Sequence, residues 1–533
     1  MSVRLFFTQI PLTKYAPELK LLQNEKILSF CIFSCGILLS FVFCAGHFMP
    51  SAFCRIFYLF RQPFFVWRLF IFVYYEVIYM DKNQSSMLAT APVGKLLAKL
   101  AAPAIAAQIV NLLYNMVDRM YIGRMESIGK LALTGVGVCF PLIMIISAFA
   151  ALVGMGAAPR ASIFMGKGDK ATAERIMNNS FSLLLIISAV LTFVFYFFAE
   201  PILMNFGASE NTIKYALEYM KIYSLGTVFV QFTLGMNSFI SAQGFAKISM
   251  LTVVIGAVLN IILDPIFIYA LGLGVKGAAI ATIISQLVSA LWILRFLIGS
   301  KTELKLKAAY MKPDPKIFIP SMALGLSPFI MQATESLISV CFNSSLLKYG
   351  GDTAVGSMTI LTSVMTFSIL PLQGLCQGAQ PIISYNFGAK NAGRVKKGFK
   401  LTLISCLVFS FAVWVLVMLF PQNFIKLFNT DAELVAFASR ALRIYMAVNC
   451  VFGAQIACQQ TFIALGNARC SLFLALLRKI ILLIPLIYIL PLFIADKTSA
   501  VFLAEPVADI IAVSCTVLLF RHEFRKAMAS LKG

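Results

Sequence analysis

Three polar side chains in an otherwise apolar stretch could together hold a cation. Asn260 and Asp264 are four residues apart, so they lie one turn apart on the same face of a predicted helix. Pro265 lacks a backbone N–H and should bend that helix. The turn at residues 272–277 is short, so the next helix should return antiparallel and place Thr282 at a similar depth. Carboxylate, amide and hydroxyl oxygens suit a hard cation or a shared proton; the alternative is that they only satisfy neighbouring helices.

An earlier polar stripe contains another acid. Its members follow steps of three, four and three residues along one helical face: Gln108, Asn111, Asn115 and Asp118. Tyr114 lies one turn before Asp118. The alternative role for Asp118 is a salt bridge with Arg119, which is disfavoured because adjacent residues on a helix point apart.

These acids are conspicuous because the chain is apolar. Of 533 residues, 60% are hydrophobic and 12% are charged, and the mean hydropathy is +0.89, whereas soluble domains carry about 25% charged residues. Apolar runs of about 20 residues recur from Lys99 onward without the alternation of a barrel. The sequence therefore predicts an all-α polytopic membrane protein. An ionised group at mid-bilayer costs about 2.5–3.5 kcal/mol, so acids within the spans indicate function.

Composition argues against several other classes. The net charge of +22 comes from basic residues in short loops, a pattern typical of cytoplasmic loops rather than of a nucleic-acid surface. The 12 cysteines form no C-x-x-C pair, and the two histidines, His47 and His522, lie outside the predicted core helices. Neither a phosphate loop nor a catalytic constellation at depth occurs. We therefore expect no enzymatic activity, no cofactor, no metal centre of the zinc or haem type, and no nucleic-acid partner.

The hydropathy pattern predicts twelve core spans. The first six lie at approximately 99–122, 133–156, 178–198, 214–240, 250–271 and 277–297, and the second six at approximately 317–341, 354–377, 400–420, 437–463, 472–493 and 500–519. The loops after spans 2, 6 and 8 and the C-terminal tail are basic, whereas those after spans 3 and 9 are acidic. Both ends of the core should therefore face the cytoplasm.

The two halves of the core repeat. At a constant offset of 222 residues, Pro159 aligns with Pro381 and Gly166 with Gly388. Six spans in each half make the halves parallel six-helix repeats, an architecture known in transporters. The predicted units are an N-terminal bundle at 90–300, a cytoplasmic linker at 301–316 and a C-terminal bundle at 317–525. Residues 1–80 form a hydrophobic extension without a counterpart in the repeat. We expect Met80 to be the true start; the alternative is that the extension contributes two further spans.

Several motifs resemble those of the multidrug and toxic compound extrusion (MATE) family, in its DinF-like branch with the MepA-type proteins. They are "YNMVDRMYIG", "APRASIFMGKGDKATA", "LNIILDPIFIYALGLGVKGAAIAT" and "GAQPIISYNFGAKN", and the resemblance covers about residues 90 to 525. It implies an antiporter in which two six-helix bundles enclose a cavity, and in which Na⁺ or H⁺ entry drives the export of organic, often cationic and aromatic, compounds. Positions matching the family's cation site are Asp118, Asn260, Asp264 and Thr282.

The resemblance also implies partners and a location. We expect small organic substrates, contact with membrane lipids, and a monomer in the bacterial inner membrane with both core termini cytoplasmic. Candidates for the substrate cavity are Gln108, Tyr114, Asn115, Asn237 and Glu335. Glu335 falls near an acid that another branch uses in span 7.

Two acids and one rival function stay open. Glu505 and Asp509 in span 12 match no family position, and a loop-facing location is an equal alternative for both. The rival function is a lipid-linked oligosaccharide flippase of the same superfamily. A polyanionic cargo would need several Arg or Lys side chains inside the spans, whereas the interior charges identified from the sequence are mainly acidic.

Overall fold

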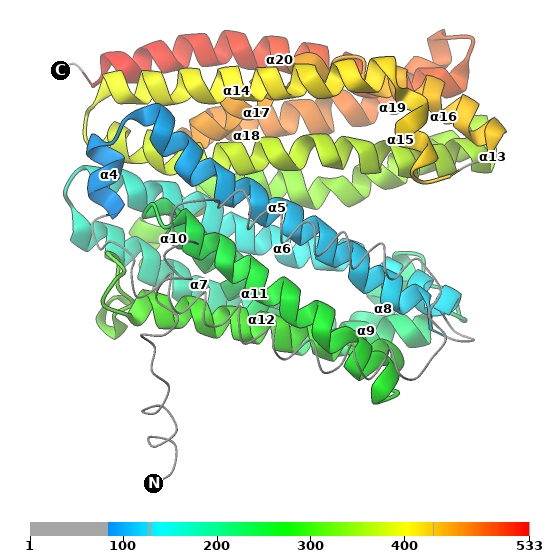
Figure 1. Cartoon of the computed structure of the whole chain (residues 1–533), viewed down its shortest axis with the longest axis horizontal. Helices are drawn as coiled ribbons and strands as arrows, with labels where there is room; N and C mark the ends of the chain where they lie inside the picture. The colour runs from blue at the N-terminus through cyan, green and yellow to red at the C-terminus, as the bar shows by residue number, and fades with distance from the viewer. Residues whose placement is uncertain (1–83, 126–128, 430, 532–533) are drawn as a thin grey trace, which may run out of the picture. The chain divides into compact units, whose positions relative to one another are not determined.

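The computed structural model describes residues 84–125, 129–429 and 431–531, and within these ranges every regular element is a helix (Figure 1). The hydrophobic extension predicted at 1–80 lies outside the described residues. Elements of the first half are α4 (Gln84–Thr90), α5 (Val93–Gly123), α6 (Gly129–Gly166), α7 (Lys170–Phe197), α8 (Ala199–Asn205), α9 (Ile213–Leu225), α10 (Thr227–Ala242), α11 (Ala246–Pro265), the π-helix η2 (Ile266–Ala270) and α12 (Gly274–Ile298).

The second half begins with a short 3₁₀ turn. Its elements are η3 (Ala308–Tyr310), α13 (Pro315–Gly388), α14 (Ala392–Leu419), α15 (Pro421–Lys426), α16 (Ala432–Tyr445), α17 (Asn449–Ala464), α18 (Ala468–Leu476), the π-helix η4 (Leu477–Leu483), α19 (Ile484–Phe493) and α20 (Lys497–Ala529). We call α5–α12 the N-bundle and α13–α20 the C-bundle. Each bundle has its own apolar core.

The described ranges contain twelve candidate membrane spans, if α13 is counted as two helices and each bent pair as one span. Nine helices there are long and apolar enough to cross a bilayer. One of the nine, α13, is two helices joined at Gly351, whose φ of 62° and ψ of −161° are not helical. Two further spans are bent pairs, α9 with α10 at 57° and α16 with α17 at 48°. The predicted all-α fold with six spans in each half is confirmed.

Helix ends differ from the predicted limits, because helical hydrogen bonding continues past the apolar runs. Helix α6 extends to Gly166 rather than to residue 156, and α14 begins at Ala392 rather than at 400. Arg160 and Arg394, which we assigned to loops, therefore lie on helices. Hydropathy marks where the hydrocarbon ends, whereas the backbone keeps its hydrogen bonds for several more residues.

The repeat is visible in the backbone. Gly168 and Lys390, separated by the offset of 222, both adopt a positive φ, of 81° and 56°. The next residue in each half caps the following helix: Asp169 accepts from Thr172 N at 3.0 Å and Asn391 from Arg394 N at 3.1 Å. The hydrogen bonds from Thr172 lower the pKa of Asp169 below its usual range. The two halves thus turn from one span into the next by the same local chemistry.

The bundles contact each other through glycines. Helices α5 and α6 of the N-bundle pack against α13, and the closest approaches lie near the basic loops. A Cβ added to Gly325 of α13 would overlap the carbonyl oxygen of Leu152 on α6, and one added to Gly388 would overlap that of Ile163. Close packing of small residues is how helices associate in lipid. The bundles are therefore joined at the end that carries the basic loops.

The linker between the bundles is bound along the N-bundle. Gln243 Oε1 accepts hydrogen bonds of 2.9 Å from Thr302, Glu303 and Leu304. On α7, Asn178 Oδ1 accepts from Lys307 N at 2.7 Å. Glu174 forms an ion pair with the Lys307 side chain, and its hydrogen bond raises the pKa of that ammonium above its usual range. The predicted linker is thus an ordered strap on one bundle.

Replacing Gly325 with alanine should weaken the contact between the bundles. The added methyl group would overlap the Leu152 carbonyl, so the helices must separate, at a cost of about 1–3 kcal/mol. Thermal unfolding in detergent should show a lower midpoint. The matched control is Gly356→Ala in the second helix of α13, beyond Gly351, where a Cβ meets nothing within 4 Å; equal stability of the two variants would contradict the prediction.

Candidate cation-binding site

Helices α5, α11 and α12 position the predicted cation ligands. Asn260 and Asp264 on α11 are 2% and 0% exposed. Asn260 Nδ2 donates to Asp264 Oδ1 at 3.1 Å and to Thr282 Oγ1 at 3.4 Å. The Thr282 hydroxyl donates in turn to the Ala278 carbonyl of its own helix at 3.0 Å. The structure therefore brings these three predicted residues together, because α12 returns antiparallel to α11 after the glycine turn.

Three oxygens at this site are buried without a hydrogen-bond partner among the described residues. They are Asp118 Oδ1, Asn260 Oδ1 and Asp264 Oδ2. Buried acceptors normally have partners, and leaving one unsatisfied costs about 1–3 kcal/mol. Because the Asn260 amide nitrogen is committed to Asp264 and Thr282, its carbonyl oxygen is left available to a ligand. Oxygens that lack donors are the arrangement expected around a cation or a proton.

Asp118 joins this group from α5. Its carboxyl group lies near that of Asp264. Two carboxylates in contact repel each other unless a proton or a cation lies between them. The alternative salt bridge with Arg119 does not form, because the Arg119 guanidinium lies over the Phe140 ring, 4.7 Å from its centroid.

The backbone beside Asp264 is irregular. Helix α11 does not end at Pro265, where we predicted a bend, but continues into the π-helix η2, in which Leu271 N donates to Ile266 O at 2.9 Å. Proline cannot donate, and the wider π turn supplies a different hydrogen-bonding pattern. Such turns often accompany functional sites. The proline therefore changes the helix type after the acid rather than breaking the span.

The cavity candidates divide into neighbours of the site and residues elsewhere. Tyr114 lies near Asp118 and Asp264. Asn115 donates to the Asn111 carbonyl of its own helix at 2.6 Å. Gln108 bonds to Gln377 of α13 at 3.1 Å, in the contact between the bundles. Asn237 donates to Ser249 O at 3.1 Å, which is about 16 Å along α11 from Asn260, so it does not join the cation ligands.

The acids of the C-bundle are paired with bases that the sequence interpretation omitted. Arg478 Nε donates to Asp509 at 2.6 Å and Arg478 Nη2 to Glu505 at 2.7 Å. Lys479 Nζ donates to Glu335 at 2.6 Å. Glu505 and Asp509 are each 4% exposed, so the loop-facing interpretation of both is wrong. The signal was present in "LLRKIILL", where two adjacent bases interrupt an apolar run.

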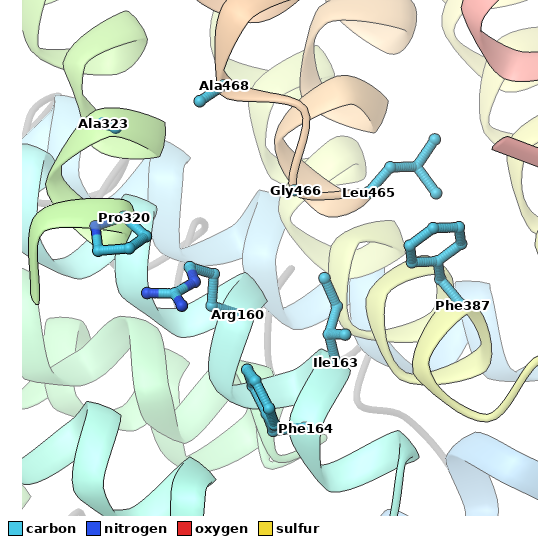
Figure 2. Close-up of a pocket in the computed structure, with 9 residues that line it drawn as sticks. All are labelled: Arg160, Ile163, Phe164, Pro320, Ala323, Phe387, Leu465, Gly466 and Ala468. Carbon is cyan, nitrogen blue, oxygen red and sulfur yellow. The ribbon is translucent and has the colours of Figure 1, made fainter. Parts of the chain in front are cut away.

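A separate cavity of about 350 Å³ lies between the bundles (Figure 2). Its lining comes from α6, from α13 and from the turn between α17 and α18. Arg160 extends toward Pro320 in Figure 2 and donates to Ile317 O at 2.8 Å and to Ser321 Oγ at 2.7 Å. No predicted cation ligand lines this cavity, so it is distinct from the site on α5, α11 and α12.

Both bundles match one known protein family. The model of the MatE family matches residues 103–266 and again residues 328–489. The chain belongs to the MatE family. These matches fall one in each bundle, and most of the site lies in the first of them, with Thr282 beyond its end.

Relatives of known name are similar along most of the chain. The multidrug export protein MepA of Staphylococcus aureus (strain N315) is 26% identical over 411 residues, which cover 77% of this chain and 90% of MepA. MepA of Staphylococcus haemolyticus is 25% identical over the same length. The MATE multidrug transporter DinF-BH, solved in complex with a ligand, is 32% identical, with a TM-score of 0.77 over 84% of this chain and 98% of that one. A MATE structure in the bent conformation shares the fold, with a TM-score of 0.79 at 24% identity. This MatE chain is therefore a multi-pass membrane transporter.

Arg478→Gln should destabilise this MatE protein strongly. Glu505 and Asp509 would lose their shared base while staying buried, and breaking a buried ion pair from one side costs about 3–5 kcal/mol. The measurement is thermal unfolding in detergent at neutral pH, with Arg469→Gln, an exposed position on α18, as the control. Unchanged stability of Arg478→Gln would show that the carboxylates are not held by this base.

Proposed function

We propose that this protein is a cation-coupled antiporter that exports organic compounds, cationic and aromatic ones above all, by alternating access. The observation that carries the proposal is the set of buried oxygens without partners on α5 and α11. Asp118, Asn260 and Asp264 each contribute one, and Thr282 adds a hydroxyl oxygen. Na⁺ or H⁺ is the coupling ion that we propose for these ligands, since oxygens bind hard cations.

Coupling follows from the charge of this site. Without a cation, Asp118 and Asp264 repel each other in an apolar interior, whereas a bound Na⁺ or a proton lets α5 and α11 approach. Substrate and cation then need only prefer different arrangements of the two bundles. A differential affinity of about 5.5 kcal/mol is enough to move the population almost completely from one arrangement to the other.

The charges in the C-bundle support a cationic substrate over a polyanionic one. Arg478 and Lys479 lie within span 11, which is where a lipid-linked phosphate would need them, but both are already paired with carboxylates. No base in this cluster is therefore available to a phosphate. The relatives are also named as multidrug transporters, and one of them was solved with a ligand bound. Adaptable Met and aromatic side chains suit a loose choice of substrate.

The location that we propose is the bacterial inner membrane, with the protein acting as a monomer. The loops with most Lys and Arg, including the strap at 301–316, would face the cytoplasm by the positive-inside rule. Glycine contacts between the bundles lie at this same end. The arrangement described above would then be closed toward the cytoplasm, with exchange of cation and substrate on the opposite side.

Asp118→Asn and Asp264→Asn should each abolish coupled efflux. An amide keeps the shape of the carboxyl group but cannot carry the negative charge that attracts the ion. Purified variants in liposomes would be loaded with a fluorescent cationic rhodamine dye, and efflux would be followed with sodium and proton gradients imposed separately. The matched control is Asp496→Asn at an exposed N-cap, where asparagine caps equally well. Full efflux by both site variants would refute this cation site.

Thr282→Val should weaken the ion's binding without abolishing transport. The variant keeps the volume of the side chain but removes one oxygen, and the loss of one ligand is worth about 1.4 kcal/mol, or tenfold. The ion concentration for half-maximal efflux should rise by about that factor. Thr282→Ser keeps the hydroxyl and should behave as wild type; if the serine variant were weakened equally, packing rather than ligation would explain the effect.

A further inference from the structure

A second buried cluster of charges lies in the C-bundle, apart from the proposed cation ligands. Its members are Arg478 and Lys479 on η4, Glu505 and Asp509 on α20, and Glu335 on α13. Side chains of the two bases are 7% and 8% exposed, those of Glu505 and Asp509 are 5% exposed, and that of Glu335 is 58% exposed. The cluster is thus closed at α20 and open at Glu335.

The charges of this cluster do not balance. On α20, two buried carboxylates share the single guanidinium of Arg478, whereas Lys479 is paired with the exposed Glu335. Full ionisation therefore leaves one excess negative charge beside Arg478. Among the described residues, the other elements packed around it supply no further ion: Tyr445 of α16 lies near Glu505, and the Phe452 ring of α17 lies 4.7 Å from the Arg478 guanidinium. An uncompensated charge at this depth is costly. The cluster therefore needs a proton or a cation from outside.

The hydrogen bonds favour a proton. Glu505 and Asp509 are four residues apart, so they lie one turn apart on the same face of α20 and both contact Arg478. A metal cation bridging these two carboxylates would lie beside the guanidinium and be repelled by it. A proton instead bonds to one carboxylate oxygen and leaves both contacts with Arg478 in place.

We propose that Glu505 and Asp509 share one exchangeable proton, which makes the C-bundle a second proton-binding site of the transporter. The step is a simple transfer: a hydronium ion gives its proton to one carboxylate oxygen and leaves as water. The net charge of the cluster changes from minus one to zero. Glu335, the exposed member, marks the side from which the proton enters. Proton binding itself does not rest on the proposed function; only its use in transport does.

Infrared spectroscopy tests this directly, because a protonated carboxyl group has a C=O stretch separate from that of a carboxylate. The sample is full-length Asp118→Asn/Asp264→Asn protein in detergent, which lacks the two acids of the proposed cation site. Its spectrum should show one protonated carboxyl band at neutral pH that disappears at alkaline pH. Adding Glu505→Gln, which removes the excess charge, should abolish the band, and so should adding Asp509→Asn. Adding Glu433→Gln, an exposed acid on α16, should leave it unchanged.

A second variant covers the case in which a carboxyl substitution prevents folding. Lys479→Gln removes a base, so the cluster should hold its proton more tightly and the band should persist to a pH higher by about one unit. An absent band, or a band that Lys479→Gln does not move, would overturn the proposal and leave the cluster as a fixed ion-pair network. Neither result depends on dye efflux, so failure here is distinguishable from failure of the antiporter function.

Discussion

The cost of a carboxylate in an apolar interior governs both halves of this protein. In the N-bundle, Asp118 and Asp264 lie near each other, neither forms an ion pair within 4 Å among the described residues, and several oxygens around them lack donors there. In the C-bundle, Arg478 lies between Glu505 and Asp509. The acids of the C-bundle are paired with buried bases, whereas Asp118 and Asp264 have no such ion pair among the described residues. The two bundles therefore share a fold but differ in how their buried carboxylates are neutralised.

The packing of the helices serves this contrast. Asp264 lies at a change from α-helix to π-helix, and Arg478 and Lys479 lie within a second π-helix, η4. In both places the wider turn is at the charged residues, where the backbone pattern must adapt to side chains that point inward. The glycine contacts between α6 and α13 lie elsewhere, toward the basic loops. The charged residues at the π-helices and the glycine contacts between the bundles thus lie on different helices.

Much of this arrangement could be predicted from the sequence. The spacing of four residues predicts that Asn260 and Asp264 share one helical face. The short glycine turn predicts that Thr282 returns to the same depth, because the rise per residue of a helix is fixed. The π-helix after Pro265 could not be predicted, since a proline is compatible with a bend or with a wider turn. The pairing of Glu335, Glu505 and Asp509 was missed because only acids were sought in the spans. Arg478 and Lys479 in "LLRKIILL" have a free-energy cost in hydrocarbon similar to that of a carboxylate, so they too indicate buried partners.

The strap has a mechanical consequence. Asn179 Oδ1 accepts from Asp314 N at 2.6 Å, so the connecting segment is held to α7 almost to the first residue of α13. Any rotation of one half against the other must be absorbed within the few residues around Asp314 and Pro315. After this segment, the Asp314 side chain caps α13 by accepting from Lys316 N at 3.0 Å. The short hinge therefore permits rotation of the bundles but prevents sliding or separation. The covalent link between the halves is therefore a short hinge and not a long flexible linker.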